Sequence, residues 1–210
     1  MGDDNVKETS LHLPQIPKPI LHCPSLDTTT PMSDGEKVMQ IKNSVCGMRF
    51  CPNDYELVCF SLIPRIFGYK PPLDIIQELD VYNTSPDNLP VYEFEYSTHG
   101  QAYFFTEKVM KKSKTKRTAG DGYWKVAGGE KCVTDNRKKQ CVGYTKTMVF
   151  HRGKAPKGEQ TKWVMDEIRV NASLYSHTER NEGLDLKMKK YVVCRIRDRE
   201  LVKDPDPYWD

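Results

Sequence analysis

Residues 107–162 combine a dense set of cations with an aromatic strand, and this combination can bind a nucleic-acid backbone. The stretch holds sixteen of the 32 lysines and arginines against five acidic residues, although the formal net charge of the whole chain is only +3. Clustered cations repel one another and cost stability unless an anion binds among them, and a phosphate backbone is the commonest long anion. The alternative is a solvated lysine-rich loop, because many charge runs only keep a surface hydrated.

The centre of this stretch, residues 122–131, suits two roles. In a structural role, Tyr123 and Trp124 anchor a strand in a sheet, and the glycine pair that follows makes a tight turn. In a DNA-reading role, the small side chains of Val126 and Ala127 let a strand edge enter the major groove, which is about 12 Å wide, while lysines on both sides contact phosphates. These residues alone leave both roles open.

The surrounding sequence predicts a domain rich in β-strands. From residue 91 onward, runs of Val, Tyr, Phe and Thr are separated by Gly, Pro or Asp, which is typical of strands and turns. We expect strands at residues 92–96, 102–106, 122–127, 131–134, 142–151, 161–170 and 190–197. Alternate side chains of 142–151 would occupy opposite faces, which indicates a twisted antiparallel sheet rather than a helical bundle.

Two short helices are expected ahead of the sheet. Asn53 suits the N-cap position and Glu56 follows three residues later, which is the spacing of a capping box. We expect this helix at residues 55–63, ended by Pro64, because a proline ring is poorly tolerated inside a helix. A second helical turn is expected at residues 74–79.

Length and composition indicate one domain between two less structured ends. With 210 residues the chain can form one ordinary domain and a tail, so we expect a disordered arm at 1–44, a folded domain at 45–200 and a short tail at 201–210. There is neither a signal-peptide pattern nor an apolar run of transmembrane length. Seven cysteines without a CxxC pair argue against a zinc finger or a secreted disulfide framework, so we expect reduced thiols.

Five ordered sequence blocks resemble the plant NAC (NAM/ATAF/CUC) transcription factors. The first block resembles the family's usual GFRFHPTDEELV, and the third and fourth blocks contain the aromatic strand and its basic flank. The blocks lie within residues 47–58, 80–90, 103–125, 143–165 and 193–196. The resemblance therefore covers nearly the whole of the expected folded region.

The resemblance implies an α+β, mainly β fold, in which a twisted antiparallel β-sheet is flanked by short helices, with no metal and no cofactor. It also implies that a strand edge enters the major groove of double-stranded DNA at sites with a CGT-type core. The implied DNA-binding residues are the strand and its flanking cations: Lys114, Lys116, Arg117, Tyr123, Trp124, Lys125, Val126, Ala127, Gly128, Gly129, Glu130, Lys131, Lys146, Lys154 and Lys157.

The resemblance further implies a dimer held together by the first block. The implied interface residues are Met48, Arg49, Phe50 and Glu56. Arg49 of one copy would pair with Glu56 of the other, and the two-fold axis would repeat this pair. Glu56 would then serve the capping box as well, which is possible because a carboxylate has several lone pairs.

The strand edge departs from the family's usual WKATG-x-DK at three positions. Val126 is larger than the usual Ala, Ala127 lacks the usual Thr hydroxyl, and Glu130 is one methylene longer than the usual Asp. If that hydroxyl contacts DNA, its loss costs about 1–3 kcal/mol.

The flanking positions depart from the family as well. Lys114 replaces an Arg and loses bidentate contact with phosphate, although extra lysines add charge nearby. Thr145 and Asp166 replace a usual Lys and His. We therefore expect DNA binding that is more salt-dependent and less selective than is typical of the family.

These observations favour a nuclear, sequence-specific DNA-binding transcription regulator that forms homodimers, or heterodimers with related NAC proteins. The basic cluster at 111–117 is of the kind that importins read. The chain ends about ten residues past the last block, so the alternative is a dimerising competitor of full-length relatives with weak or non-specific DNA binding. An enzyme is disfavoured, because none of the five histidines is flanked by a nucleophile motif, and we expect neither a membrane partner nor a small-molecule substrate.

Overall fold

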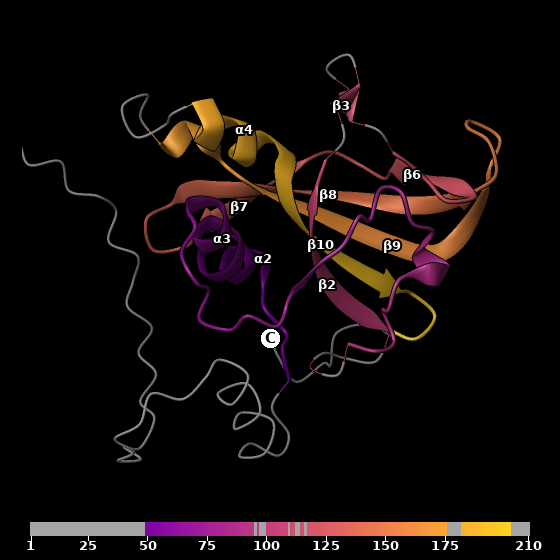
Figure 1. Cartoon of the computed structure of the whole chain (residues 1–210), viewed down its shortest axis with the longest axis horizontal. Helices are drawn as coiled ribbons and strands as arrows, with labels where there is room; N and C mark the ends of the chain where they lie inside the picture. Colours follow the sequence, from indigo (N-terminus) through magenta and orange to yellow (C-terminus); the bar gives the residue numbers. More distant parts are fainter. Residues whose placement is uncertain are drawn as a thin grey trace, which may run out of the picture.

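A single curled sheet forms the frame of the protein in the computed structural model, which describes residues 49–94, 96, 100–108, 110–111, 114–115, 117–175 and 182–202 (Figure 1). The strands are β1 (Gln77–Glu78), β2 (Gln101–Glu107), β3 (Met110–Lys111), β4 (Lys114–Thr115), β5 (Thr118–Ala119), β6 (Gly122–Val126), β7 (Lys131–Asp135), β8 (Gln140–Arg152), β9 (Glu159–Val170) and β10 (Tyr191–Asp198). The helices are α2 (Asp54–Glu56), η1 (Leu57–Leu62), α3 (Ile63–Phe67), η2 (Pro86–Asn88), η3 (Ala172–Leu174) and α4 (Glu182–Lys190).

The main sheet has eight strands and confirms the predicted mainly β fold. Its order is β1-β2-β10-β9-β8-β6-β5, with β7 also paired to β8, while β3 and β4 form a separate pair. All pairings in the main sheet are antiparallel except that of β1 with β2. Figure 1 shows the long β8–β9 hairpin reaching away from α2, α3 and α4, which gather at the other end of the molecule.

The first helix begins where the sequence predicts but does not end at Pro64. Asn53 Oδ1 accepts the backbone N–H of Glu56 at 2.9 Å, and Glu56 Oε2 accepts that of Asn53 at 2.8 Å, which confirms the capping box. Residues 57–62 then wind as a π-helix, so that Pro64 falls in the first turn of α3. The helical run therefore continues through Pro64 to Phe67 and ends at Gly68 with φ 78°.

Two expected elements are wrong. Instead of a helical turn at 74–79, β1 pairs with β2, and the Leu79 N–H donates to the Phe105 carbonyl at 2.9 Å. Sheet pairing satisfies backbone groups that an isolated helical turn leaves exposed. The expected strand at 92–96 is absent from its described residues, because side chains hold this segment across the end of the sheet: the Tyr92 hydroxyl donates to Asp198 at 2.6 Å and its ring contacts Trp163.

Helix α4 was not expected. Its first turn carries Glu182 and Asp185 and its last turn carries three lysines, a distribution that suits the helix dipole. Met188 is the buried residue of this helix.

The expected domain boundary at residues 44–45 and most of the expected 201–210 tail lie outside the described residues. No helix among those described is long and apolar enough to cross a membrane.

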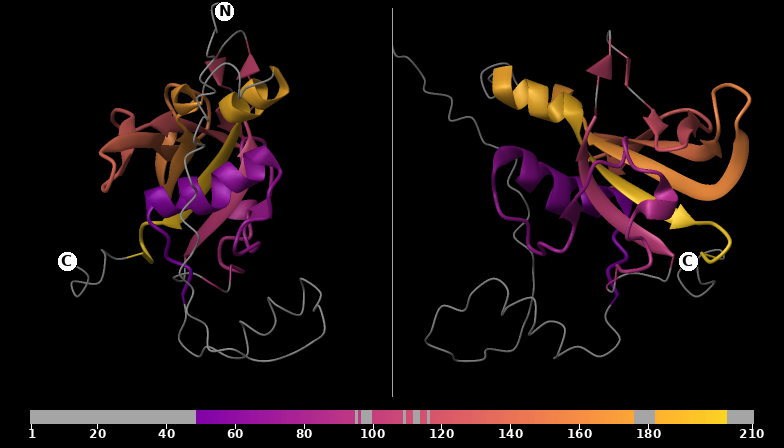
Figure 2. Two further views of the ribbon diagram at one scale, coloured as in Figure 1. Left: turned by 90° about the vertical axis from the view of Figure 1, so that its left-hand side faces the viewer. Right: turned by 45° about the vertical axis from the view of Figure 1, so that its right-hand side comes forward.

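The sheet is buried on both faces. One face, which includes Trp124, Phe150 and Trp163, is covered by the segment around Tyr82. The other face packs under the α2–η1–α3 segment, whose Leu57 contributes to a second core (Figure 2). This double covering buries the central strands.

A disulfide bond joins Cys132 of β7 to Cys141 of β8. The expectation of reduced thiols is therefore wrong for this pair. The spacing of the two cysteines along the chain did not indicate the disulfide. The bond depends on the antiparallel pairing of β7 with β8, which brings the Cα atoms of Cys132 and Cys141 to 5.8 Å from each other.

Candidate nucleic-acid interface

Residues 125–131, here called the reading edge, lie between two strands that both pair with β8. Strand β6 pairs with residues 148–152 of β8 and β7 pairs with residues 140–145, so the intervening residues project from the same side of β8. The Ala127 N–H donates to the Thr147 carbonyl at 2.9 Å, which holds the start of the projection against the sheet. All residues of the reading edge are exposed except Val126, which is half-buried.

The glycine pair shapes the reading edge. Gly128 has φ 92°, a conformation that side-chain-bearing residues rarely adopt, and an added Cβ would meet no neighbour within 4 Å. An added Cβ at Gly129 would also meet open space. The backbone turn, rather than packing, therefore requires glycine at Gly128, and the space beside both residues leaves the backbone accessible.

The two aromatic residues ahead of the reading edge anchor it to the protein. Trp124 is 1% exposed and its ring meets that of Phe150 edge-on at 5.2 Å. Tyr123 is also buried and stacks on His151 at 5.5 Å. Both side chains are covered by the protein, so the structural role is the one that the geometry supports for both residues. Lys125, the next residue, is exposed.

Glu130 is tied to the sheet rather than directed to solvent. Both of its carboxylate oxygens accept from Arg169, at 3.1 and 2.8 Å, and Lys146 lies 3.4 Å from the same carboxylate. The Arg169 guanidinium lies 4.1 Å from the centre of the Tyr144 ring, and hydrogen bonding from Arg169 lowers the pKa of Glu130. Sequence reasoning missed Arg169 and Tyr144; they face each other only in the β8–β9 register.

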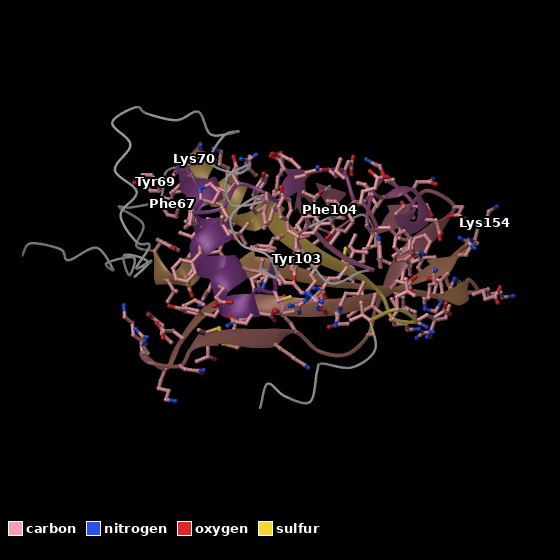
Figure 3. All side chains as sticks on the ribbon, turned by 90° about the horizontal axis from the view of Figure 1, so that it is seen from below. Phe67, Tyr69, Lys70, Tyr103, Phe104 and Lys154 are labelled. Carbon is pink, nitrogen blue, oxygen red and sulfur yellow. A yellow bond between two sulfur atoms is a disulfide. The ribbon has the colours of Figure 1, made fainter. Side chains whose placement is uncertain are left out.

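The remaining predicted cations lie on both sides of the reading edge. Lys154 and Lys157 are exposed in the β8–β9 turn, and Figure 3 shows Lys154 at one extreme of the molecule. This turn is held to β8, since the His151 Nδ1 lies 3.1 Å from the Gly158 carbonyl. Arg117 is half-buried and its carbonyl accepts the Trp124 N–H at 2.7 Å. Lys114 belongs to β4, and Lys116 lies outside the described residues.

The matches to known proteins agree with this geometry. Residues 45–170 match the family model described as "No apical meristem (NAM) protein". This chain belongs to the NAC family of plant transcription factors.

Several curated NAC proteins are similar over most of this chain. It is 39% identical over 155 residues to NAC domain-containing protein JA2 of Solanum lycopersicum, covering 71% of this chain and 41% of that protein. It is 36% identical over 163 residues to Protein ATAF2 of Arabidopsis thaliana, covering 75% and 55% respectively. The matched region thus spans about half or less of these relatives.

The first NAC block places its side chains in two different environments. Arg49 is exposed, whereas the neighbouring Phe50 ring packs edge-on against Tyr103 at 5.1 Å and against Phe94 at 6.3 Å within the same chain. Glu56 is half-buried, with one carboxylate oxygen in the capping box. Met48 lies outside the described residues.

Asp166, in the place of the usual NAC histidine, organises the face of the sheet beside the helix. It is buried and accepts from Arg195 at 3.1 and 2.9 Å, from Arg197 at 2.7 Å and from Thr147 at 2.7 Å. Arg195 also lies 3.0 Å from Asp54 at the start of α2. The Asp166 carboxylate thus pairs with two arginines, and Arg195 links the sheet to the helix through Asp54.

Thr145, in the place of the usual NAC lysine, joins the same network. Its hydroxyl donates to Asp54 Oδ2 at 2.7 Å, and the residue is buried. Both substitutions thus serve packing and polar contacts inside this chain.

Proposed function

We propose that this chain is a sequence-specific DNA-binding transcription regulator that acts as a dimer in the nucleus. The observation that carries the proposal is the projecting reading edge, held by buried Tyr123 and Trp124 and exposing Lys125, small residues and Lys131. Such an edge suits the major groove, because small side chains let the backbone approach base edges while lysines contact phosphates. Membership of a transcription factor family supports a regulatory rather than an enzymatic role.

The proposed partner is double-stranded DNA with a CGT-type core, together with a second copy or a related NAC protein. Exposed Lys154 and Lys157 lie beyond one side of the reading edge and would contact phosphates there. Arg49 is exposed and would pair with Glu56 of the other copy across a two-fold axis. The basic cluster at 111–117 would serve nuclear import.

A second candidate is a dimerising competitor that binds DNA weakly. It is favoured by one observation: Ala127 is exposed at the centre of the reading edge but has no hydroxyl to offer a base or a phosphate. In this candidate Arg49 and Glu56 keep their dimer role, and DNA affinity comes only from phosphate contacts.

Fluorescence anisotropy of the full chain separates the two candidates. A duplex with a CGT core is compared with a scrambled duplex of equal length across a salt series. Preference for the core of about tenfold, or 1.4 kcal/mol, supports a sequence-reading regulator. Equal affinities that vanish together as salt rises favour the competitor, because counterion release alone does not depend on sequence.

A pair of lysine variants locates the interface. Lys125→Ala should weaken binding and reduce the magnitude of the salt slope by about 0.9, the value for one lost phosphate contact. Lys187→Ala, at an exposed lysine of α4, is the matched control and should leave both quantities unchanged. The reverse pattern would place the DNA on another face.

A further inference from the structure

We propose that Cys132 and Cys141 are a reversible oxidation site that controls the order of the reading edge. The proposal rests on the proposed function for its DNA readout, but its chemistry can be tested without DNA. Thiols in the nucleus are normally kept reduced, and disulfides that do form in reducing compartments are usually transient and redox-sensing. A disulfide one residue beyond the reading edge of a nuclear regulator therefore calls for a regulatory explanation.

The disulfide lies at the less buried end of the reading edge, next to the Glu130–Arg169 pair. At its N-terminal end the edge continues from buried Trp124. At its C-terminal end it continues into β7, in which only Val133 and Asp135 are buried. Asp135 is engaged in the turn that follows, where it accepts the Arg137 N–H at 2.8 Å.

A groove separates β7 from the helical segment beneath it. The groove has a volume of about 750 Å³ and is lined by residues 131–137 of the β7 region, by residues 53–56 and Phe60 of the helix, and by Thr145. Strand β7 is therefore not closely packed on the side of the groove. Its order depends on pairing with β8, on Val133 and on the disulfide, since the register already shifts between Val133 and Thr134.

The two cysteines are placed for stepwise exchange. Cys132 is exposed and Cys141 is half-buried, so a small-molecule disulfide such as oxidised glutathione reaches Cys132 first. The Cys132 thiolate attacks one glutathione sulfur, forms a mixed disulfide and releases one glutathione. The Cys141 thiolate then attacks the Cys132 sulfur and releases the second glutathione. The two cysteines lose two electrons, glutathione disulfide gains them, and the two thiol protons end on the two released glutathiones.

Reduction should loosen the end of the reading edge without unfolding the domain. The bond closes a short loop, with a sequence separation of 9, and its loss allows β7 to open locally while the covered central strands stay in place. We expect the reduced protein to bind the CGT-core duplex about fivefold more weakly, the lower end of the range typical of coupling between two sites.

Peptide mapping tests the chemistry directly. The full chain is equilibrated in glutathione buffers from reducing to oxidising, alkylated, and digested with trypsin, which releases residues 132–137 and 140–146 as separate peptides unless the disulfide links them. The linked pair should vanish at a reducing cellular ratio and return in oxidised glutathione. A bond that persists under reducing conditions would be a fixed crosslink and would overturn the proposal, as would a bond that never forms.

Hydrogen exchange and DNA affinity test the coupling. Amides at 125–135 should exchange faster in the reduced protein, and the double variant Cys132→Ser with Cys141→Ser should match the reduced protein in every buffer. Cys51→Ser, at an exposed cysteine outside the disulfide, should keep the redox response. If amide protection is the same in both states, the coupling is refuted. If protection changes but neither state binds DNA, the proposed function fails while the redox site stands.

Discussion

Glu130 and Arg169 form a bidentate ion pair that joins the reading edge to β9, with nitrogen–oxygen distances of 3.1 and 2.8 Å. Glu130 is the one acidic residue within residues 125–131. Because its carboxylate is engaged by Arg169 and Lys146, the negative charge is neutralised within the protein and does not repel a phosphate. The same contacts hold the C-terminal end of the reading edge, so Glu130 affects both the charge of the reading edge and its position.

Glu130→Gln should reduce sequence discrimination more than it reduces affinity. The amide keeps the length of the side chain but loses the charge-assisted pair with Arg169, which frees Arg169 and Lys146 for phosphate. We expect the ratio of affinities for CGT-core and scrambled duplexes to fall by about tenfold, equivalent to 1.4 kcal/mol. Glu130→Asp is the charge-conserving control. An equal loss of affinity for both duplexes would show that Glu130 does not position the edge.

The Glu130 contact should also appear in the pH dependence of stability. Hydrogen bonding from Arg169 lowers the pKa of Glu130 below its usual 4.5. A lowered carboxyl pKa contributes stability that is fully present above pH 4.5 and is lost as the pH falls through the value in the folded protein. The difference in Tm between the wild type and Glu130→Gln should therefore be constant at neutral pH and shrink below pH 4.5. A Tm difference that stays constant as the pH falls well below 4.5 would contradict this.

Trp124 and Lys125 should separate folding from binding. Trp124→Ala removes a buried ring and should lower the free energy of unfolding by about 3–5 kcal/mol. Lys125→Ala, one residue later and exposed, should change it by less than about 0.5 kcal/mol while weakening DNA binding. Urea denaturation and anisotropy give the two quantities for each variant. Loss of DNA binding by a stable Trp124→Phe protein would instead assign the indole a direct contact.

Asp166 should be among the most sensitive polar residues. Asp166→Ala leaves Arg195 and Arg197 without their shared buried partner, and breaking such a buried pair costs about 3–5 kcal/mol. Asp74→Ala, which removes a partly exposed pair with Arg65 at 3.8 Å, should cost about 0–1 kcal/mol. Denaturant midpoints of the two variants check the contrast. Similar costs for both would show that the Asp166 network contributes little.

Glu56→Gln should distinguish the capping role of this residue from its proposed dimer role. Glutamine can still accept the Asn53 N–H in a capping box, so we expect the free energy of unfolding to change by less than about 0.5 kcal/mol. The missing charge should weaken pairing with Arg49 of a second copy and raise the dimer dissociation constant, as measured by analytical ultracentrifugation. Arg49→Ala should raise it similarly. A dimer unaffected by both variants would place the interface elsewhere.

Local sequence patterns determined much of this architecture. The alternation within 142–151 predicted a long strand of an antiparallel sheet, and β8 occupies that range with one or two more residues at each end. The Asn53 and Glu56 spacing predicted the helix start, and the five NAC blocks predicted the family and the mainly β fold. These features depend on contacts between residues close in sequence, or on motifs that are read directly from it.

The tertiary structure decided the features that depend on distant residues. It replaced the expected turn at 74–79 with β1, because β2 offers backbone partners there, and it joined Cys132 to Cys141 through the β7–β8 register. It also directed Glu130 toward Arg169, nearly forty residues away in the chain. Pairing register, burial and charge neutralisation are properties of the folded arrangement, so no local pattern could have specified which side chains of the reading edge are exposed and which hold it in place.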